Sequence, residues 1–195
     1  MDKYCDFAEL SLHEREDEDF ERSYRDRESP VLVAAPHAGG IEPYTGWLAA
    51  RIAREDLSLY CFRGLKQSEN RDLHLTSTRF DEPIGVQAAT TAQTVLAIHG
   101  EQTHEEEFVM VGGLDDAMRD QIAEQLVAGG FSIRQPSSSL AGASRCNICN
   151  RGTSGRGVQL EVSRGLRQRL RSDDDLAERF VLAIRVAVAG SARET

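Results

Sequence analysis

Residues 30–40 read PVLVAAPHAGG, and this stretch decides the fold. From Pro30 to Pro36 the run is apolar and rich in valine, which is typical of a strand buried on both faces of a sheet. The run ends abruptly at His37, which two glycines soon follow. In α/β sheets, ligands gather at the carboxyl ends of the strands. We therefore expect a buried central strand here, with a functional side chain directly after it.

Strands and helices alternate along the rest of the chain. Leu114 to Ala128 is amphipathic and stops at two glycines, and three aspartates at 173–175 are typical of the cap of a last helix over residues 176–189. This alternation predicts an α/β fold, a single three-layer domain with a mainly parallel or mixed central sheet. Further strands are expected over residues 19–25, 57–62, 73–78, 94–98, 107–111, 131–134 and 157–163, and further helices after Pro43 and over 86–93.

Length and composition favour one soluble globular domain. The 195 residues predict a single domain over 1–195, in which residues 1–29 form a charged, partly ordered N-terminal segment. The formal net charge of −9 speaks against a nucleic-acid partner. The N-terminus lacks the pattern of a signal peptide, and the longest apolar stretch, residues 180–189, is too short to span a bilayer. We expect a cytoplasmic protein with no membrane partner.

Three residues near predicted strand ends could hold a metal ion. His37 follows the central strand, Glu42 comes five residues later, and His99 ends another strand. A helix would put His37 and Glu42 on different faces, whereas a tight turn at Gly39 and Gly40 can bring them together. Two histidines and a carboxylate leave a coordination position open for water, the pattern of a catalytic zinc. The alternative is that these are hydrogen-bonded core residues.

Glu161 is a candidate for acid–base chemistry. In the predicted strand over residues 157–163, Val158, Leu160 and Val162 face one way and Glu161 faces the other. A central strand of such a sheet should be apolar on both faces, so a glutamate there indicates a cleft. The alternative is an edge strand with a solvated face.

Arginines are concentrated between residues 145 and 171. A local basic surface on an acidic protein suits an anionic substrate, because arginine binds carboxylates through paired hydrogen bonds. Arg145, Arg151 and Arg156 lie in a long Gly- and Ser-rich loop and are the better candidates for ligand contact. Residues 164–171 are interpreted mainly as a solvated helix face. The remaining histidines, including His74, have no convincing partner in the sequence.

Cys146 and Cys149 form a CxxC motif. A structural zinc needs four ligands, and the chain has no second pair of this kind. We interpret both as ordinary thiols in a reducing compartment.

Six segments taken in order resemble one family. They read APHAGGIEPYTG, SLYCFRGLK, LHLTSTRFDEP, AIHG, VGGLD and NICNRGTSGRGVQLEVSRGLR. Together they resemble the poly-γ-glutamate hydrolases, small phage-related enzymes also labelled phage-related replication proteins. The resemblance runs from about residue 7 to residue 171 and rests on the order and spacing of all six segments. One departure is Ala38, where the family more often has glycine.

The resemblance implies a zinc-carboxypeptidase-like fold and hydrolysis of γ-linked glutamate amides. One Zn²⁺ per chain would be held by His37, Glu42 and His99, with Glu161 as the general base. Asn150-Arg151 resembles the pair that holds a substrate carboxylate in carboxypeptidase-like enzymes. Arg145 would stabilise the oxyanion.

Two other functions stay open at this point. A zinc deacylase of small N-acyl amino acids would use the same metal and base on a small anionic amide in place of an anionic polymer. A non-catalytic phage replication accessory protein would need a nucleic-acid surface, against which the acidic composition and the missing DNA-binding motifs speak.

Overall fold

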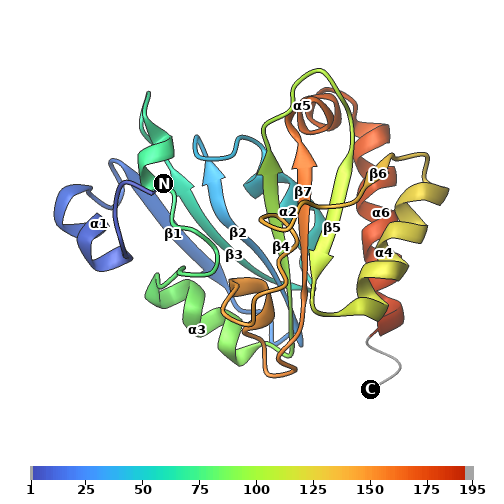
Figure 1. The fold of residues 1–195 in the computed structure, drawn as a ribbon, viewed down its shortest axis with the longest axis horizontal. Helices are drawn as coiled ribbons and strands as arrows, with labels where there is room; N and C mark the ends of the chain where they lie inside the picture. Colours follow the sequence, from blue (N-terminus) through green and yellow to red (C-terminus); the bar gives the residue numbers. More distant parts are fainter. Residues whose placement is uncertain (1, 192–195) are drawn as a thin grey trace.

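The structure, a computed structural model, describes residues 2–191 and is built around one sheet (Figure 1). Within that range the sheet has seven strands in the order β1-β3-β2-β4-β7-β5-β6. Pairing is antiparallel between β1 and β3 and between β5 and β7, and parallel elsewhere. The α/β fold with a mixed sheet is thereby confirmed. The strands are β1 Phe20–Arg25, β2 Val31–Gly39, β3 Ser58–Gly64, β4 Thr94–Glu101, β5 Val109–Gly113, β6 Ile133–Arg134 and β7 Val158–Ser163.

Helices cover both faces of the sheet and make three layers. One core unites one face of the sheet with α2, α4, α5 and α6, and a second core unites the other face with α1 and α3. Figure 1 shows α4 and α6 together on one side and α1 and α3 on the other. The helices are α1 Phe7–His13, α2 Thr45–Ala53, α3 Pro83–Thr91, α4 Asp116–Ala128, α5 Arg164–Ser172 and α6 Asp174–Ser191, with short 3-10 helices η1 Asn70–Leu73 and η2 Ile148–Asn150.

The apolar run quoted first is the central strand β2. It pairs with β3 on one side and β4 on the other, both parallel, and its residues from Val31 to Ala38 are all buried. This burial on two faces explains why the run shows no polar alternation. The predicted cap of the last helix is also present, since Asp173 Oδ1 accepts a hydrogen bond from the Leu176 N–H at 2.9 Å.

The strand predicted over residues 73–78 is wrong. The chain there leaves η1 at Leu73 and continues without a ladder partner. Leu73 and Leu75 are buried, so the alternation is real, but this segment lines a pocket instead of joining the sheet. None of the helices described is long and apolar enough to cross a membrane.

Candidate metal centre

A bulge in β2 aims His37 at the centre of the site. The register with β3 shifts between Ala35 and Ala38, at Pro36 and His37. Proline cannot donate to the ladder, and bulges both tolerate it and redirect neighbouring side chains. His37 is 1% exposed, and its Nε2 lies 2.8 Å from the Leu75 carbonyl oxygen. A carbonyl only accepts, so Nε2 carries a proton, and the neutral imidazole then has its lone pair on Nδ1.

A tight turn brings Glu42 back to His37. The Glu42 N–H donates to the His37 carbonyl oxygen at 2.8 Å. Gly39 has a φ of +67°, and a Cβ there would lie 2.2 Å from the Gly64 carbonyl oxygen, so the turn requires glycine as the sequence indicated. The buried Glu42 carboxylate places Oε1 3.2 Å from His37 Nδ1 and accepts the Gly100 N–H on Oε2 at 2.8 Å.

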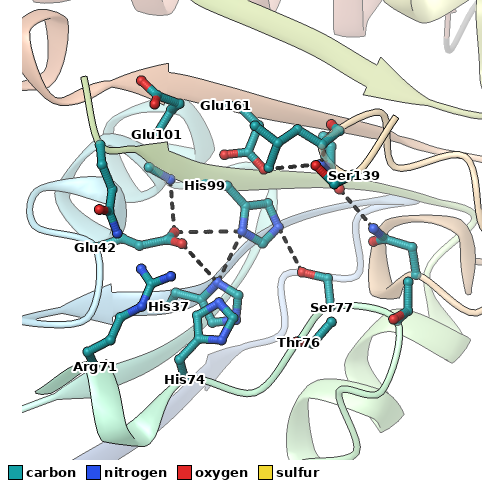
Figure 2. A pocket seen from close by; sticks show the side chains of 16 residues that line it. His37, Glu42, Arg71, His74, Thr76, Ser77, His99, Glu101, Ser139 and Glu161 are labelled. Carbon is teal, nitrogen blue, oxygen red and sulfur yellow. Dashed lines mark hydrogen bonds and ion pairs between the residues drawn. The ribbon is translucent and has the colours of Figure 1, made fainter. Parts of the chain in front are cut away.

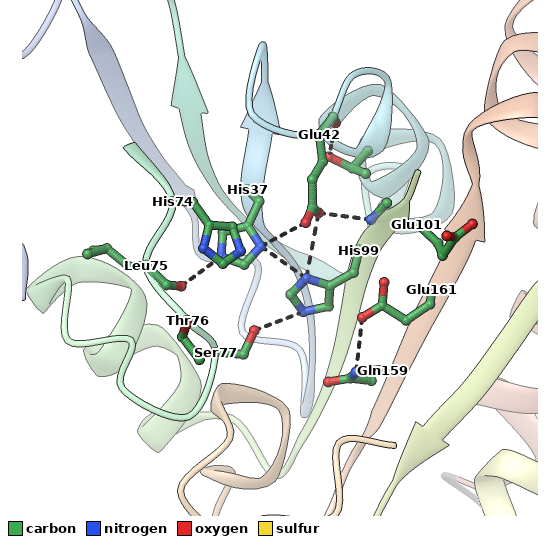
Figure 3. A network of polar contacts seen from close by, with 12 residues as sticks. His37, Glu42, His74, Leu75, Thr76, Ser77, His99, Glu101, Gln159 and Glu161 are labelled. Atoms are coloured by element: carbon green, nitrogen blue, oxygen red, sulfur yellow. Dashed lines mark hydrogen bonds and ion pairs between the residues drawn. The ribbon is translucent and has the colours of Figure 1, made fainter. Parts of the chain in front are cut away.

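His99, near the end of β4, completes the group. Its Nδ1 lies 3.2 Å from His37 Nδ1 and 3.6 Å from Glu42 Oε2. Its Nε2 lies 3.4 Å from the Ser77 hydroxyl, and its side chain is buried. Figure 3 shows the three side chains converging from β2, the following turn and β4.

This donor set fits a divalent cation. If Ser77 accepts from His99 Nε2 and both rings are in their neutral form, the two imidazoles turn their Nδ1 lone pairs toward one another, an arrangement that a bound cation stabilises. The ligand atoms of His37, Glu42 and His99 all lie within 4.8 Å of one another. Burial works against the Glu42 charge, but the two histidines hold the pKa of this carboxyl well below its usual range. Two imidazole nitrogens and one carboxylate oxygen are a ligand set of catalytic zinc.

Glu161 stands beside this group and not at a sheet edge. β7 lies between β4 and β5, and Glu161 is the register partner of His99. The carboxyl is 6% exposed and accepts a hydrogen bond from Gln159 Nε2 at 3.1 Å. Burial, and then the charge of Glu42, raise the pKa of Glu161 to about 8. The edge-strand alternative is therefore excluded, and the glutamate marks a cleft.

That cleft is a pocket of about 490 Å³ (Figure 2). It opens over the candidate metal ligands and Glu161 and is lined mainly by polar side chains. Its lining comprises His37, Glu42, Arg71, His74, Thr76, Ser77, Thr78, His99, Gly100, Glu101, Gln102, Ser139, Leu140, Asn147, Gln159 and Glu161.

His74 is a pocket residue that the sequence did not reveal. Its ring centroid lies 4.1 Å from that of His37, and its Nδ1 lies 2.8 Å from Asp2 Oδ1. Burial, and then the neighbouring His37, lower the pKa of His74 to about 4. The segment that carries His74 was predicted to be a strand of the sheet, and that prediction gave no indication that His74 packs against His37.

Arg167 is a second unexpected site neighbour. It is 2% exposed, although its helix α5 was interpreted mainly as a solvated face. Its guanidinium donates to the carbonyl oxygens of Val162 at 3.0 Å, Glu101 at 2.9 Å and Pro43. These carbonyls belong to β7, β4 and the turn after Glu42, so one buried cation joins the three segments that carry the site.

The structure does not bring the predicted substrate-binding residues into the pocket lining. Asn150 is 3% exposed, and its side-chain amide donates to two loop carbonyls. The Arg151 guanidinium donates to the carbonyl oxygens of Phe80 at 2.6 Å and Cys146 at 2.7 Å. Arg145 is exposed in the same loop, outside the lining. Their substrate contacts remain predictions.

The sequence is similar to one known protein family and to proteins of Bacillus subtilis. Residues 4–181 match the family model described as poly-gamma-glutamate hydrolase. The chain is 38% identical over 170 residues to the UPF0714 protein YmaC of Bacillus subtilis (strain 168), covering 86% of this chain and 71% of YmaC. It is 36% identical over 171 residues to the UPF0714 protein YndL of the same organism, covering 87% and 67%. The chain thus spans about two thirds of these relatives.

Solved structures show the same fold. A bacteriophage poly-gamma-glutamate hydrolase superposes with a TM-score of 0.94 at 28% identity over the whole of both chains. A zinc-free apo form of YndL superposes with a TM-score of 0.87 at 32% identity, covering 98% of this chain and 99% of that one. An N-acetylmuramoyl-L-alanine amidase from Clostridium difficile 630 shares the fold, with a TM-score of 0.53 at 10% identity, covering 84% and 96%. Sequence, fold and site together place this chain in the poly-gamma-glutamate hydrolase family.

Proposed function

We propose that the chain hydrolyses γ-glutamyl amide bonds of poly-γ-glutamate, with one zinc ion held by His37, Glu42 and His99 and with Glu161 as the general base. The observation that carries the proposal is the direct pairing of His99 with Glu161 across β4 and β7. This pairing sets a buried carboxyl next to a metal-ligand set at the base of one pocket. Family membership and the phage enzyme's fold support the choice of substrate.

A zinc ion held by His37, Glu42 and His99 would supply a Lewis acid for the scissile carbonyl and would lower the pKa of the attacking water. The protein's own groups then do the remaining work. In its ionised form, Glu161 takes a proton from the water and delivers it to the leaving amine. Gln159 donates a hydrogen bond to one oxygen of Glu161 at 3.1 Å, so the other oxygen would be the one that receives the proton.

The outer contacts hold the ligands in place. The Leu75 carbonyl fixes the tautomer of His37, and the Gly100 N–H binds the Glu42 oxygen that faces His99. Such outer partners orient the ligands and raise metal affinity. Both contacts come from backbone groups, so a side-chain substitution can disturb them only by shifting the backbone.

The test is turnover of poly-γ-glutamate by the purified chain. We expect cleavage that a chelator abolishes and added zinc restores, with one zinc per chain by metal analysis. An α-linked polyglutamate of equal length is the matched control, since it carries the same charge on a different linkage. Small N-acyl amino acids test the deacylase alternative. Cleavage that survives complete removal of metal, or no cleavage of any γ-glutamyl amide, would refute the proposal.

A further inference from the structure

Arg71 is the pocket residue whose chemistry the mechanism leaves unused. Among the described residues that line the pocket it is the only arginine or lysine. It is exposed, and within residues 2–191 no ion pair joins its guanidinium to an acid. An arginine at the wall of a polar pocket with no acidic partner is available to a ligand.

The backbone of Arg71 is rigidly placed relative to the metal ligands. Arg71 lies in η1 directly after Asn70, whose side chain bonds both backbone groups of Lys66 at 2.7 and 3.1 Å. Asn70 packs so closely against the turn that carries Glu42 that a Cβ on Gly40 would lie 2.3 Å from Asn70 Nδ2. In the view of Figure 2, Arg71 and Ser139 lie on opposite sides of His99. Arg71 therefore forms one wall of the site and does not belong to a separate surface.

The charge balance of the pocket gives Arg71 a role. Besides Arg71, the ionisable residues of the lining are three histidines and the acids Glu42, Glu101 and Glu161. A polyanionic chain entering such a pocket is repelled by carboxylates that are not neutralised. The other arginines expected to receive the substrate are engaged with backbone carbonyls or lie outside the lining, as described above. Arg71 is thus the cation left to receive a substrate anion.

Poly-γ-glutamate presents a suitable anion at a fixed place. Each residue of a γ-linked chain keeps a free α-carboxylate, and one lies on each side of the scissile amide, only a few single bonds from it. A guanidinium binds a carboxylate through two parallel hydrogen bonds, a geometry that an ammonium cannot reproduce. Building on the proposed function, we infer that Arg71 binds one of the two α-carboxylates that flank the scissile γ-amide and thereby selects γ-linked substrates.

The experiment compares Arg71→Ala with wild type on short γ-glutamyl oligomers. The first oligomer has only free carboxylates. In the second, the α-carboxylate on the acyl side of the scissile amide is amidated. In the third, the α-carboxylate on the leaving-amine side is amidated. We expect Arg71→Ala to raise KM for the free oligomer by about 10-fold or more with a smaller change in kcat. One of the two amidated oligomers lacks the carboxylate that Arg71 binds, and on this oligomer wild type should already show the raised KM. Arg71→Ala should raise KM for that oligomer no further. The oligomer that behaves in this way shows whether Arg71 binds the carboxylate on the acyl side or on the leaving-amine side.

Two further variants sharpen the result. Arg71→Lys keeps the charge without the paired hydrogen bonds and should fall between wild type and Arg71→Ala. Arg63→Ala is the matched control, since Arg63 is an exposed arginine outside the lining that pairs with Glu21 at 3.1 Å, and its KM should equal that of wild type. Equal losses on the free and both amidated oligomers, or an unchanged KM, would overturn the inference.

Binding measured by calorimetry separates this inference from the proposed function. Oligomer binding that depends on Arg71 without any turnover would support the carboxylate contact and refute the hydrolase. Metal-dependent turnover that is indifferent to Arg71 would support the hydrolase and refute the contact. Neither binding nor turnover would refute both.

Discussion

Gly100 leaves the space that the guanidinium of Arg167 fills, since a Cβ on Gly100 would lie 2.5 Å from Arg167 Cζ. The same glycine donates its N–H to Glu42 Oε2 at 2.8 Å. One residue therefore supports a proposed metal ligand, Glu42, through its backbone and makes room for the buried Arg167 guanidinium because it has no side chain. The geometry of the ligands and the packing beneath them are coupled at this point.

Gly100→Ala should disturb both contacts. The Arg167 side chain is held by three backbone carbonyls and cannot yield freely, so the added methyl should destabilise the fold by about 1–3 kcal/mol. Shifting the Gly100 N–H should also weaken zinc binding. Denaturant unfolding of the metal-free protein and a zinc titration measure the two effects. Gly190→Ala, in α6, is the control, because a Cβ on Gly190 would meet only the end of the Gln121 side chain, at 3.4 Å from Oε1. Wild-type stability and zinc affinity in Gly100→Ala would contradict the coupling.

Glu42 and Glu161 should give separable signatures. Glu161→Gln keeps the size of the side chain but cannot accept a proton, so the variant should retain zinc and lose turnover by about 10²–10⁴-fold. Glu42→Gln should lose zinc together with activity, because a neutral amide is a poor zinc ligand. Metal analysis and turnover on the same samples decide between them. Zinc lost from Glu161→Gln but kept by Glu42→Gln would reverse the two roles.

The sequence predicted those features that depend on local chemistry. The central strand was predictable because residues 31–38 are apolar throughout, and the turn to Glu42 because Gly39 permits a positive φ. The ligand candidates followed from polar residues at the ends of strands, since the carboxyl ends of parallel strands meet at one edge. Each of these inferences needs only the chain within a few residues of the feature.

The features that the sequence missed depend on distant neighbours. Leu73 and Leu75 alternate as in a strand, but a strand also needs a ladder partner, and this segment lines the pocket without one. Arg167 shares its helix with exposed arginines, and only the fold supplies the three carbonyls that bury it. His74 is placed against His37 by the same unforeseen segment. The pattern of polar and apolar residues within one segment does not predict contacts between segments that are far apart in the sequence.

The metal-free protein should lose stability as pH rises through the titration of Glu161. Its pKa is raised from its ordinary value of 4.5 to about 8, so the folded state binds this proton more tightly than the unfolded state. The contribution to stability is therefore complete below the unfolded value and is lost as pH rises through the folded one. Urea unfolding at about pH 5 and about pH 9 should show a larger decline for wild type than for Glu161→Gln. Equal declines would remove Glu161 as the cause.

Arg151→Ala distinguishes a substrate contact from an anchor of the loop. Arg151 donates to the carbonyl oxygens of Phe80 and Cys146, so its removal should lower the free energy of unfolding by about 1–3 kcal/mol. If Arg151 only anchors the loop, KM at a temperature well below unfolding should equal that of wild type. A raised KM at unchanged stability would instead support the carboxylate contact expected from the sequence.

The four cysteines should differ sharply in reactivity toward an alkylating reagent. The thiolate is the reactive form, and a thiol with a pKa near 11 is ionised to less than about one part in a thousand at neutral pH. Burial raises the pKa of Cys61 to about 11 and that of Cys149 to about 12. Hydrogen bonds to the carboxylates of Glu9 and Asp6 raise the pKa of Cys5 to about 11, although Cys5 is exposed.

Cys146 is exposed and free, so it should take the first label alone. Intact-mass measurement during brief alkylation should show one fast addition, which Cys146→Ser removes, and denaturation should release the other thiols. This outcome fits an ordinary thiol at Cys146, because neither a disulfide nor a metal would leave it reactive. Two results would contradict that interpretation. In the first, unreduced protein takes no fast label until a reductant is added. In the second, stoichiometric zinc suppresses the fast labelling of a variant that lacks His37 and His99. The first would indicate a Cys146–Cys149 disulfide, and the second would indicate that the CxxC motif binds zinc.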